Sequence, residues 1–375
     1  MRGVIRIAFR NTRRQMKRAV LLGGAVAFGV MVITLLNAFT SGAVANIKEN
    51  LSYAMGGHIF IRGTELTETG REVDRIGDDH ILRAAVDTSD PRIRSIHRRS
   101  GAQTTLIFGS RAASQWIDGV DFTAETELAR GLQIREGSLD DLSDPQLLIL
   151  PAPVAERLGV EVGESVLVRL VTVTGQQNVG ELRVVAIIED TAGFGIATAY
   201  TSIKYLNSLI GLAEGEYQSF NVFLHAIGDI DAVAADIYRA IQDAGAPAER
   251  PLAGVSSLED FEAQGMEAFG AMFGVAMEVI AEEPWEGTKF SLTTLNEMMQ
   301  PVVAAMSVLD GIALGIFIIL LVITAVGIMN TFRMVMIERT REIGTMRAFG
   351  MQRKTVRSIF LWEAVIISLA GGVVG

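Results

Sequence analysis

The sequence predicts an α-helical membrane protein with a large extracytoplasmic α+β domain inserted between its first two spans. Three apolar runs, within residues 19–43, 306–332 and 356–375, have the length and composition of membrane-spanning helices. Basic residues gather at the two ends of the chain. Between the first two runs, short β-rich stretches alternate with turns and a few helical patterns. These observations together favour a domain of mixed structure held outside the membrane by helices.

Composition and charge support the same arrangement. The 375 residues are 49% hydrophobic and 20% charged, which is too polar for a wholly embedded protein and too apolar for a wholly soluble one. Residues 1–18 hold seven Lys and Arg and no acid, and residues 333–375 hold seven against three Glu. The intervening residues keep 19 of the 33 basic and 40 of the 43 acidic side chains. Since cytoplasmic loops carry the excess of Lys and Arg, both end regions are predicted to face the cytoplasm.

Six segments are expected along the chain. They are an amphipathic cytoplasmic helix at 1–18, a first span at 19–43, the extracytoplasmic domain at 44–305, a second span at 306–332, a cytoplasmic segment at 333–355 and a third span at 356–375. The basic N-terminal helix suits the inner membrane surface. Nucleic-acid binding is the rival reading, but an uncharged run from Ala19 to Phe39 follows at once. That run is also longer than the ~7–15 residues of a cleaved signal core, although Ala43-Val44-Ala45 resembles a cleavage site.

The extracytoplasmic segment is predicted to form an α+β domain of two lobes. The first helix should continue outward to the Gly56-Gly57 pair. Strands are expected at 58–62, 147–150, 165–174, 181–188 and 220–225, and helices at 152–158 and 230–244. The turn at 175–180 makes the middle strands a hairpin. An inserted lobe is expected at about 116–195.

Residue patterns for chemistry are sparse. No two of the four His stand at metal-ligand spacing, and the chain has no Cys, so neither zinc nor disulfide or thiolate chemistry is indicated. Asp140, Asp141 and Asp144 lack the pattern of a calcium loop, and a solvated turn explains them more simply. No Walker, G-x-S-x-G or dinucleotide motif occurs. We therefore expect a non-catalytic subunit with no cofactor or metal of its own.

An amphipathic insertion is predicted at about 255–300. Its apolar residues recur at three and four positions, its polar face carries only acids, and methionines cluster in and after it. Interfacial membrane helices usually carry Lys and Arg instead, so this helix is expected to pack on protein rather than to lie on the membrane surface. The candidate surface for cargo or a partner consists of Phe261, Phe269, Met272, Met277 and Ile280.

The cytoplasmic segment 333–355 is a candidate docking element because it is short, charged and attached to apolar runs at both ends. If it is helical, Glu338, Arg341 and Glu342 share one face. The alternative is a solvated loop that only fixes topology. The residues proposed for docking are Glu338, Arg339, Arg341, Glu342, Arg347 and Phe349.

The sequence resembles the FtsX-like (MacB/LolC/LolE-type) permeases of ABC transporters. The resemblance rests on E-R-T-R-E-I-G-T-M-R-A-F-G at 338–350, L-W-E-A at 361–364, the final G-G-V-V-G, the basic opening at 5–18, and L-L-I-L-P-A-P-V-A-E-R-L-G-V-E-V-G-E-S-V at 147–166. It implies a MacB-like periplasmic core domain, a coupling helix at 338–350, and a location in the bacterial inner membrane with the N-terminus in the cytoplasm. Since the family has a fourth span, we expect the natural chain to continue past Gly375.

The resemblance also implies partners and a mechanism. Separate ABC ATPase subunits would bind ATP and Mg, and a second permease would complete a homo- or heterodimer surrounded by membrane lipids. ATP-driven motion would pass to the outer domain and act there on a lipoprotein, a lipid or another hydrophobic cargo, with a lipoprotein or extracytoplasmic carrier as a possible partner. The alternatives are an FtsX-like regulator of cell-wall hydrolases that moves no cargo, and a drug or peptide exporter.

Overall fold

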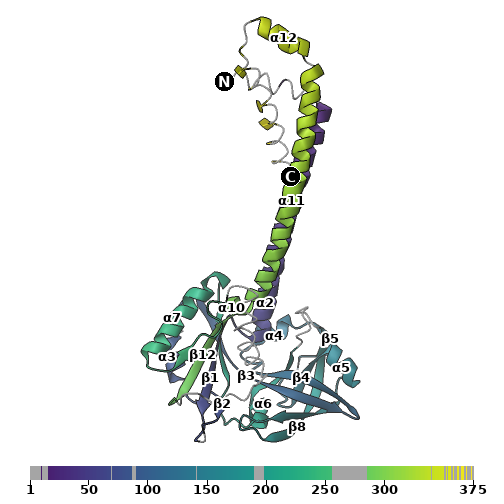
Figure 1. The fold of residues 1–375 in the computed structure, drawn as a ribbon. Coiled ribbons are helices and arrows are strands. Elements are labelled where there is room, and N and C mark those ends of the chain that lie inside the picture. The colour runs from purple at the N-terminus through teal and green to yellow at the C-terminus, as the bar shows by residue number, and fades with distance from the viewer. Residues whose placement is uncertain are drawn as a thin grey trace. The chain divides into compact units, whose positions relative to one another are not determined.

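The computed structural model divides into two compact units. It describes Arg10, residues 16–68, 70–86, 90–140, 142–189, 198–255, 285–338 and 340–349, and isolated residues between 352 and 373. One unit consists of residues 1–44 and 305–375, and the other of residues 45–304. Figure 1 traces the chain through both.

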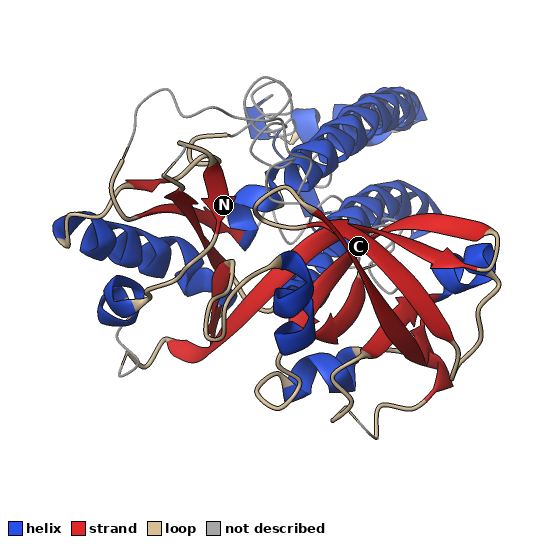
Figure 2. Ribbon diagram, turned by 90° about the horizontal axis from the view of Figure 1, so that it is seen from below, coloured by secondary structure: helices blue, strands red, loops and turns tan. Residues whose placement is uncertain are grey.

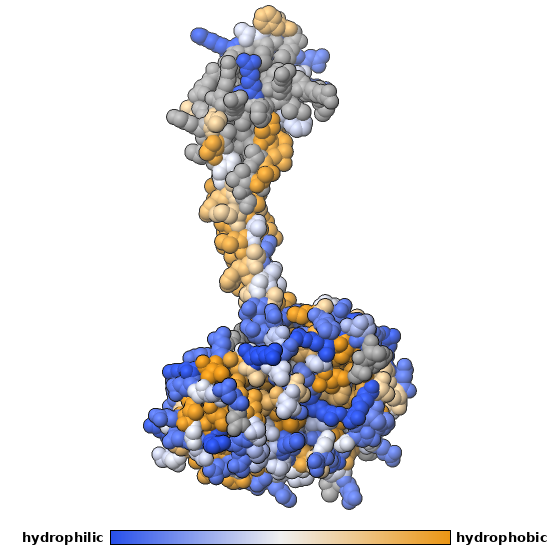
Figure 3. Space-filling view, turned by 180° about the vertical axis from the view of Figure 1, so that it is seen from behind, coloured by the Kyte–Doolittle hydropathy of each residue, from blue (hydrophilic) through white to orange (hydrophobic). Residues whose placement is uncertain are grey.

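The helical unit contains most of two long helices, α2 (Met16–Met55) and α11 (Gln300–Glu338), and the short α12 (Thr340–Ala348). Among the described residues, two helical stretches are long and apolar enough to cross a membrane, Val26–Met55 and Gln300–Gly327. Within this unit Thr40 Oγ1 donates a hydrogen bond to Asp310 Oδ1 at 3.1 Å. Apolar side chains on both helices are exposed, as the orange surface in Figure 3 shows, so they need an apolar environment such as lipid. The third predicted span falls where only isolated residues are described.

The α+β unit is built on one continuous path of strands. In the order β11-β12-β1-β10-β3-β4-β9-β6-β8-β5, neighbouring strands are hydrogen-bonded, while β2 pairs with β1, and β7 pairs with β3 and β8. The strands are β1 (Ile59–Leu66), β2 (Glu72–Asp74), β3 (Ile93–Phe108), β4 (Arg111–Val120), β5 (Ile134–Gly137), β6 (Leu147–Pro151), β7 (Ser165–Val171), β8 (Gln177–Ile188), β9 (Ala199–Ser202), β10 (Ser219–Leu224), β11 (Ala248–Glu249) and β12 (Thr288–Thr294).

The 16-residue strand β3 belongs to both lobes. Its first part, Ile93–Arg99, pairs with β10 in the first lobe, and its second part, Ser100–Phe108, pairs with β4 in the second. In the second lobe the pairings β3-β4-β9-β6-β8-β7-β3 form a closed ring of strands, which Figure 2 shows at the lower right. Arg99 therefore lies where one strand passes between the lobes.

Helices complete each lobe. α3 (His80–Ala85), α7 (Ile230–Asp243) and α10 (Leu295–Met298) accompany the first lobe, and α4 (Thr126–Gly131), α5 (Ala152–Leu158) and α6 (Ile203–Ile210) accompany the second, with the 3₁₀ turn η1 (Ile227–Asp229) before α7. The first core packs Ile59, Phe220 and Phe290 against α7 residues such as Ile237. The second fills the ring of strands with residues such as Leu106 and Val168. Burying these apolar side chains stabilises each lobe by ~1.5–3 kcal/mol per large residue.

Several local predictions are confirmed. The first helix continues to Met55 and ends at Gly56, whose φ is 76°. The strands at 147–150 and 220–225 and the helices at 152–158 and 230–244 correspond to β6, β10, α5 and α7. The hairpin around residues 175–180 is β7 paired antiparallel with β8. An α+β domain of two lobes is thus present. Of the amphipathic insertion predicted at about 255–300, residues 256–284 lie outside the described residues, and the last part forms β12, α10 and the start of α11 instead of one amphipathic helix.

Candidate functional site

The predicted docking segment contains a helix. α12 begins at Thr340 and ends at Ala348, and it follows α11, which ends at Glu338. Arg341 and Arg347 are exposed on it, and Phe349 is 92% exposed just beyond its end. Glu342 lies within α12, while Arg339 is outside the described residues. An exposed helix with cations and an apolar end residue has the composition of a docking surface, and the docking role itself stays a prediction.

The predicted cargo surface cannot be placed, because Phe261, Phe269, Met272, Met277 and Ile280 all lie outside the described residues. Two residues of the acidic cluster at 140–144 contact neighbouring side chains. Asp140 accepts a hydrogen bond from Ser138, and Asp144 forms an ion pair with Arg183. Among the described residues, no group of three or more His, Asp or Glu side chains is placed to hold a metal ion.

The most distinctive polar site of the α+β unit is the end of α2. A helix leaves its last four carbonyls without intrahelical donors. Here Gly57 N–H donates to Ser52 O at 2.9 Å and Gly56 N–H to Tyr53 O at 3.2 Å, which is the Schellman arrangement. Asn221 Nδ2 on β10 donates to Met55 O at 2.9 Å. Two of these three donors are the backbone N–H groups of the Gly56-Gly57 pair, which the sequence analysis identified as the helix end.

Arg99 supplies the donor for the one remaining carbonyl of the last turn, that of Ala54. Its Nη1 donates to Ala54 O, and its Nη2 lies 3.4 Å from Tyr53 O. The guanidinium also holds Glu125, the residue before α4, through Nε at 3.1 Å from each carboxylate oxygen and Nη2 at 2.5 Å from Oε2. Both residues are 3% exposed. Arg99 thus joins the end of α2 to both lobes, and we call Arg99, Glu125 and the last turn of α2 the arginine joint.

The electrostatics of the arginine joint are those of a buried pair. Burial by itself would lower the pKa of Arg99, but Glu125 and Asp118 raise it above its ordinary value, so the guanidinium stays charged. Burial raises the pKa of Asp118, whose carboxylate is 3.6 Å from Arg99 Nη1. Gly56 makes room for this arrangement, because a Cβ there would lie 2.5 Å from Arg99 Nε. Glycine is therefore required at that position for its positive φ and for space.

A second contact ties α2 to α10. Lys48 Nζ donates to Asn296 Oδ1 at 2.8 Å, and Asn296 Nδ2 donates to Asp231 of α7 at 3.1 Å. α10 begins with a capping box, in which Thr294 accepts from Glu297 N–H and the Glu297 side chain accepts from Thr294 N–H. Lys48 near the end of α2 and Asn296 just before α11 are therefore both fixed to the first lobe.

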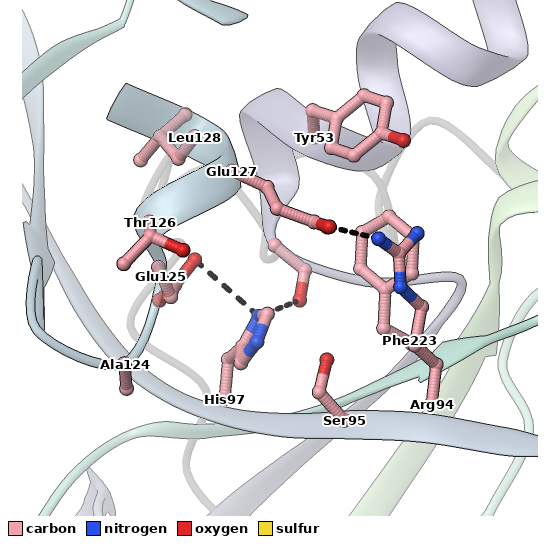
Figure 4. A pocket seen from close by; sticks show the side chains of 11 residues that line it. Tyr53, Arg94, Ser95, His97, Ala124, Glu125, Thr126, Glu127, Leu128 and Phe223 are labelled. Carbon is pink, nitrogen blue, oxygen red and sulfur yellow. Dashed lines mark hydrogen bonds and ion pairs between the residues drawn. The ribbon is translucent and has the colours of Figure 1, made fainter. Parts of the chain in front are cut away.

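A cavity of about 210 Å³ lies beside the arginine joint. It is bounded by Tyr53 of α2, by Arg94 and His97 of β3, by Phe223 of β10, and by the α4 region with Glu125 and Glu127. Figure 4 shows His97 beside Glu125, with the Arg94–Glu127 ion pair next to Phe223. His97 Nδ1 donates to Gly56 O at 3.0 Å. Burial lowers the pKa of His97, so this ring is neutral at pH 7.

Sequence reasoning missed both the joint and the cavity. Arg99 sits in the run His97-Arg98-Arg99, which resembles a solvated strand face. Its partner Glu125 is 26 residues away, and only the pairing of β3 with β4 and β10 brings the two together. The Gly56-Gly57 pair was the one available signal, since it marked the helix end that needed donors.

Comparison with known proteins defines the class. The description "MacB-like periplasmic core domain" matches residues 20–240, and "FtsX-like permease C-terminal" matches residues 314–375. The first match alone covers more than half of the chain, so the chain belongs to the FtsX-like ABC transporter permeases with a MacB-like periplasmic core domain, as the resemblance predicted.

Curated relatives match over shorter segments. Macrolide export ATP-binding/permease protein MacB of Syntrophobacter fumaroxidans is 36% identical over 92 residues, 24% of this chain and 13% of that protein. An uncharacterized ABC transporter permease of Methanocaldococcus jannaschii is 31% identical over 109 residues, 27% of each chain. The probable syringafactin export ATP-binding/permease protein SyfD of Pseudomonas syringae is 40% identical over 90 residues, 24% of this chain and 14% of that protein. The chain thus spans 13–27% of the length of these relatives.

Solved structures of similar domains cover about half of the chain. The extracellular domain of the transporter YknZ from Gram-positive bacteria is 12% identical, covering 49% of this chain and 94% of that one with a TM-score of 0.34. The periplasmic region of MacB from Actinobacillus actinomycetemcomitans is also 12% identical, covering 50% and 86% with a TM-score of 0.32.

Proposed function

We propose that this chain is the permease subunit of an ABC transporter of the mechanotransmission type. ATP binding and hydrolysis on partner subunits in the cytoplasm move α12, and α2 carries the motion into the extracytoplasmic domain. The observation that carries this proposal is the arginine joint. A helix whose last four carbonyls are all bound by donors from the glycine pair, β3 and β10 cannot fray there, so movement of the helix moves the sheet with it.

The partners follow from the same proposal. Separate ABC ATPase subunits bind ATP and Mg, and α12 docks on them through Arg341, Arg347 and Phe349. Two permeases, identical or different, form a dimer in the bacterial inner membrane, with the N-terminus in the cytoplasm. The support is the charge asymmetry of the chain, the exposed helix α12 and family membership.

The cargo is a lipoprotein, a lipid or another hydrophobic molecule handled on the outer side of the membrane. The predicted surface of Phe261, Phe269, Met272, Met277 and Ile280 would contact it, with methionine allowing varied shapes. Export of a drug or peptide is the second candidate, which the similarity to a macrolide exporter and a probable syringafactin exporter favours.

The test is ATP hydrolysis by the reconstituted complex. The chain is purified with its co-purifying ATPase and placed in lipid nanodiscs. Reversing one interfacial charge by Arg341→Glu should lower hydrolysis about 30-fold or more, because loss of such a charge pair costs ~2–5 kcal/mol. Arg341→Lys is the matched control and should retain most activity. Wild-type hydrolysis and complex yield in Arg341→Glu would refute docking through α12.

A further inference from the structure

The outer surface of the second lobe carries an apolar patch. In the described part of the α+β unit five large apolar side chains are exposed, and all five belong to this lobe: Ile134, Val162, Leu167, Val171 and Val179. Three of them lie on the hairpin of β7 and β8, where residues alternate between the interior of the ring and the surface. Exposed apolar side chains that lie next to one another mark a protein contact face.

The strand register arranges part of this patch as a diagonal row. Leu167 of β7 lies opposite Ile107 of β3 on one side and Glu181 of β8 on the other. Val179 lies opposite Arg169, so it is the diagonal neighbour of Leu167. Because residues opposite each other point to the same face, the outer surface carries a row of Ile107, Leu167 and Val179. Arg169 flanks this row on one side and Glu181 on the other, and we call these five residues the hairpin patch.

The two charges of the hairpin patch are free to meet a partner. Arg169 and Glu181 are both exposed, and in the part of the chain that the structure describes neither side chain has an ion-pair or hydrogen-bond partner. The nearby Arg183, in contrast, is paired with Asp144. A cation and an anion on opposite sides of an apolar row make the patch complementary to itself. A two-fold axis along the row would place Arg169 of each copy over Glu181 of the other copy.

We propose that the hairpin patch is the contact between the second lobes of two copies of this chain. This rests on the proposed function in that two permeases form a dimer, and it adds that the two copies are identical and meet here. The apolar rows pack on each other, and two Arg169–Glu181 ion pairs flank them. Such a contact is far smaller than the ~800 Å² that each partner buries in a stable complex. It therefore forms only between copies that membrane helices already hold together, because tethering supplies an effective concentration on the order of mM.

Single cysteines test the two-fold axis, because the chain has no Cys. Val179 lies on the row and would face the same residue of the second copy, whereas Val171 lies on the Arg169 side and would be far from its counterpart. The two valines are 58% and 57% exposed, so they are a matched pair. The full chain and its ATPase, in nanodiscs that hold one permease dimer, are treated with copper phenanthroline. Val179→Cys should form a disulfide-linked dimer roughly ten-fold faster than Val171→Cys, or faster still.

Charge reversals in the Val179→Cys chain test the two ion pairs. Arg169→Glu and Glu181→Arg each put like charges together at both flanks of the contact and should slow cross-linking roughly ten-fold. The double variant Arg169→Glu/Glu181→Arg restores opposite charges and should recover the original rate. Arg157→Glu reverses an exposed charge on α5 and should leave the rate unchanged. Thermal melts of all variants verify folding.

Two results would overturn the proposal. One is equal cross-linking of Val179→Cys and Val171→Cys, including none in either, and the other is a double charge variant as slow as the single reversals. ATP hydrolysis is measured on the same nanodiscs. Normal hydrolysis with failed cross-linking would remove this contact and leave the proposed transport function in place, whereas the transport function fails on its own test of Arg341→Glu.

Discussion

Replacing Arg99 by methionine tests how firmly α2 is attached to the α+β unit. The change removes three contacts to Glu125, two to the carbonyls of Tyr53 and Ala54, and the ion pair with Asp118. Glu125, which is 3% exposed, is then left as a buried carboxylate without its guanidinium. Removing one partner of a buried ion pair costs ~3–5 kcal/mol. For a domain of this size each kcal/mol lowers the melting temperature by ~2–4 °C, so Arg99→Met should lower it by ~6–20 °C.

The assay is thermal unfolding of the full chain in detergent, followed by intrinsic fluorescence. Arg135→Met removes an exposed ion pair and is the matched control, with an expected cost of ~0–1 kcal/mol. The double variant Arg99→Met/Glu125→Met should recover most of the loss, since an apolar pair can replace a buried ion pair. About 1–2 kcal/mol should remain lost, because Ala54 O keeps no donor. Wild-type melting of Arg99→Met, or a double variant as unstable as the single one, would refute the reasoning.

Further predictions concern the glycine, the buried histidine and the topology. Gly56→Ala should destabilise the α+β unit by ~1–3 kcal/mol, and Gly163→Ala, which has a φ of 92° and open space, should cost less because it adds strain without a clash. Burial lowers the pKa of His58 from 6.5 to about 4, so its neutral form contributes stability that is complete above pH 6.5 and is lost as the pH falls towards 4. Melting temperatures at pH 7.5 and pH 5 should therefore differ more in the wild type than in His58→Asn, and equal differences would remove His58 as the cause. The chain has no Cys, so single cysteines can be labelled in intact spheroplasts: one at Gln177 should react with an impermeant maleimide and one at Gln352 should not, and the opposite pattern would overturn the topology.

Local features of the fold were predictable because short-range chemistry sets them. Gly56 and Gly57 ended a long helix, the turn at 175–180 joined two alternating strands, and periodic apolar residues identified α5 and α7. Each of these depends on residues close together in the sequence.

The closed ring of strands and the arginine joint could not be predicted in the same way. β4 pairs with β9 in parallel between residues about 80 positions apart, as in Ile117 with Ala199, and a single sequence carries no signal for such pairing. Arg99 was indistinguishable from its neighbour Arg98, which is half exposed. Only the passage of β3 between the lobes turns one of these arginines inward.

The central claim is that motion driven by ATP reaches the extracytoplasmic domain through α2 and the arginine joint. The most direct measurement is double electron–electron resonance on the permease reconstituted with its ATPase in nanodiscs. Gln177 is replaced by a spin-labelled cysteine in both copies of the permease, and the distance between the two labels is measured. Trapping the ATP-bound state should shift the distance distribution in the wild type. In Arg99→Met/Glu125→Met, which stays folded, the shift should be lost while ATP hydrolysis continues. An unchanged wild-type distance, or the same shift in the double variant, would contradict the claim.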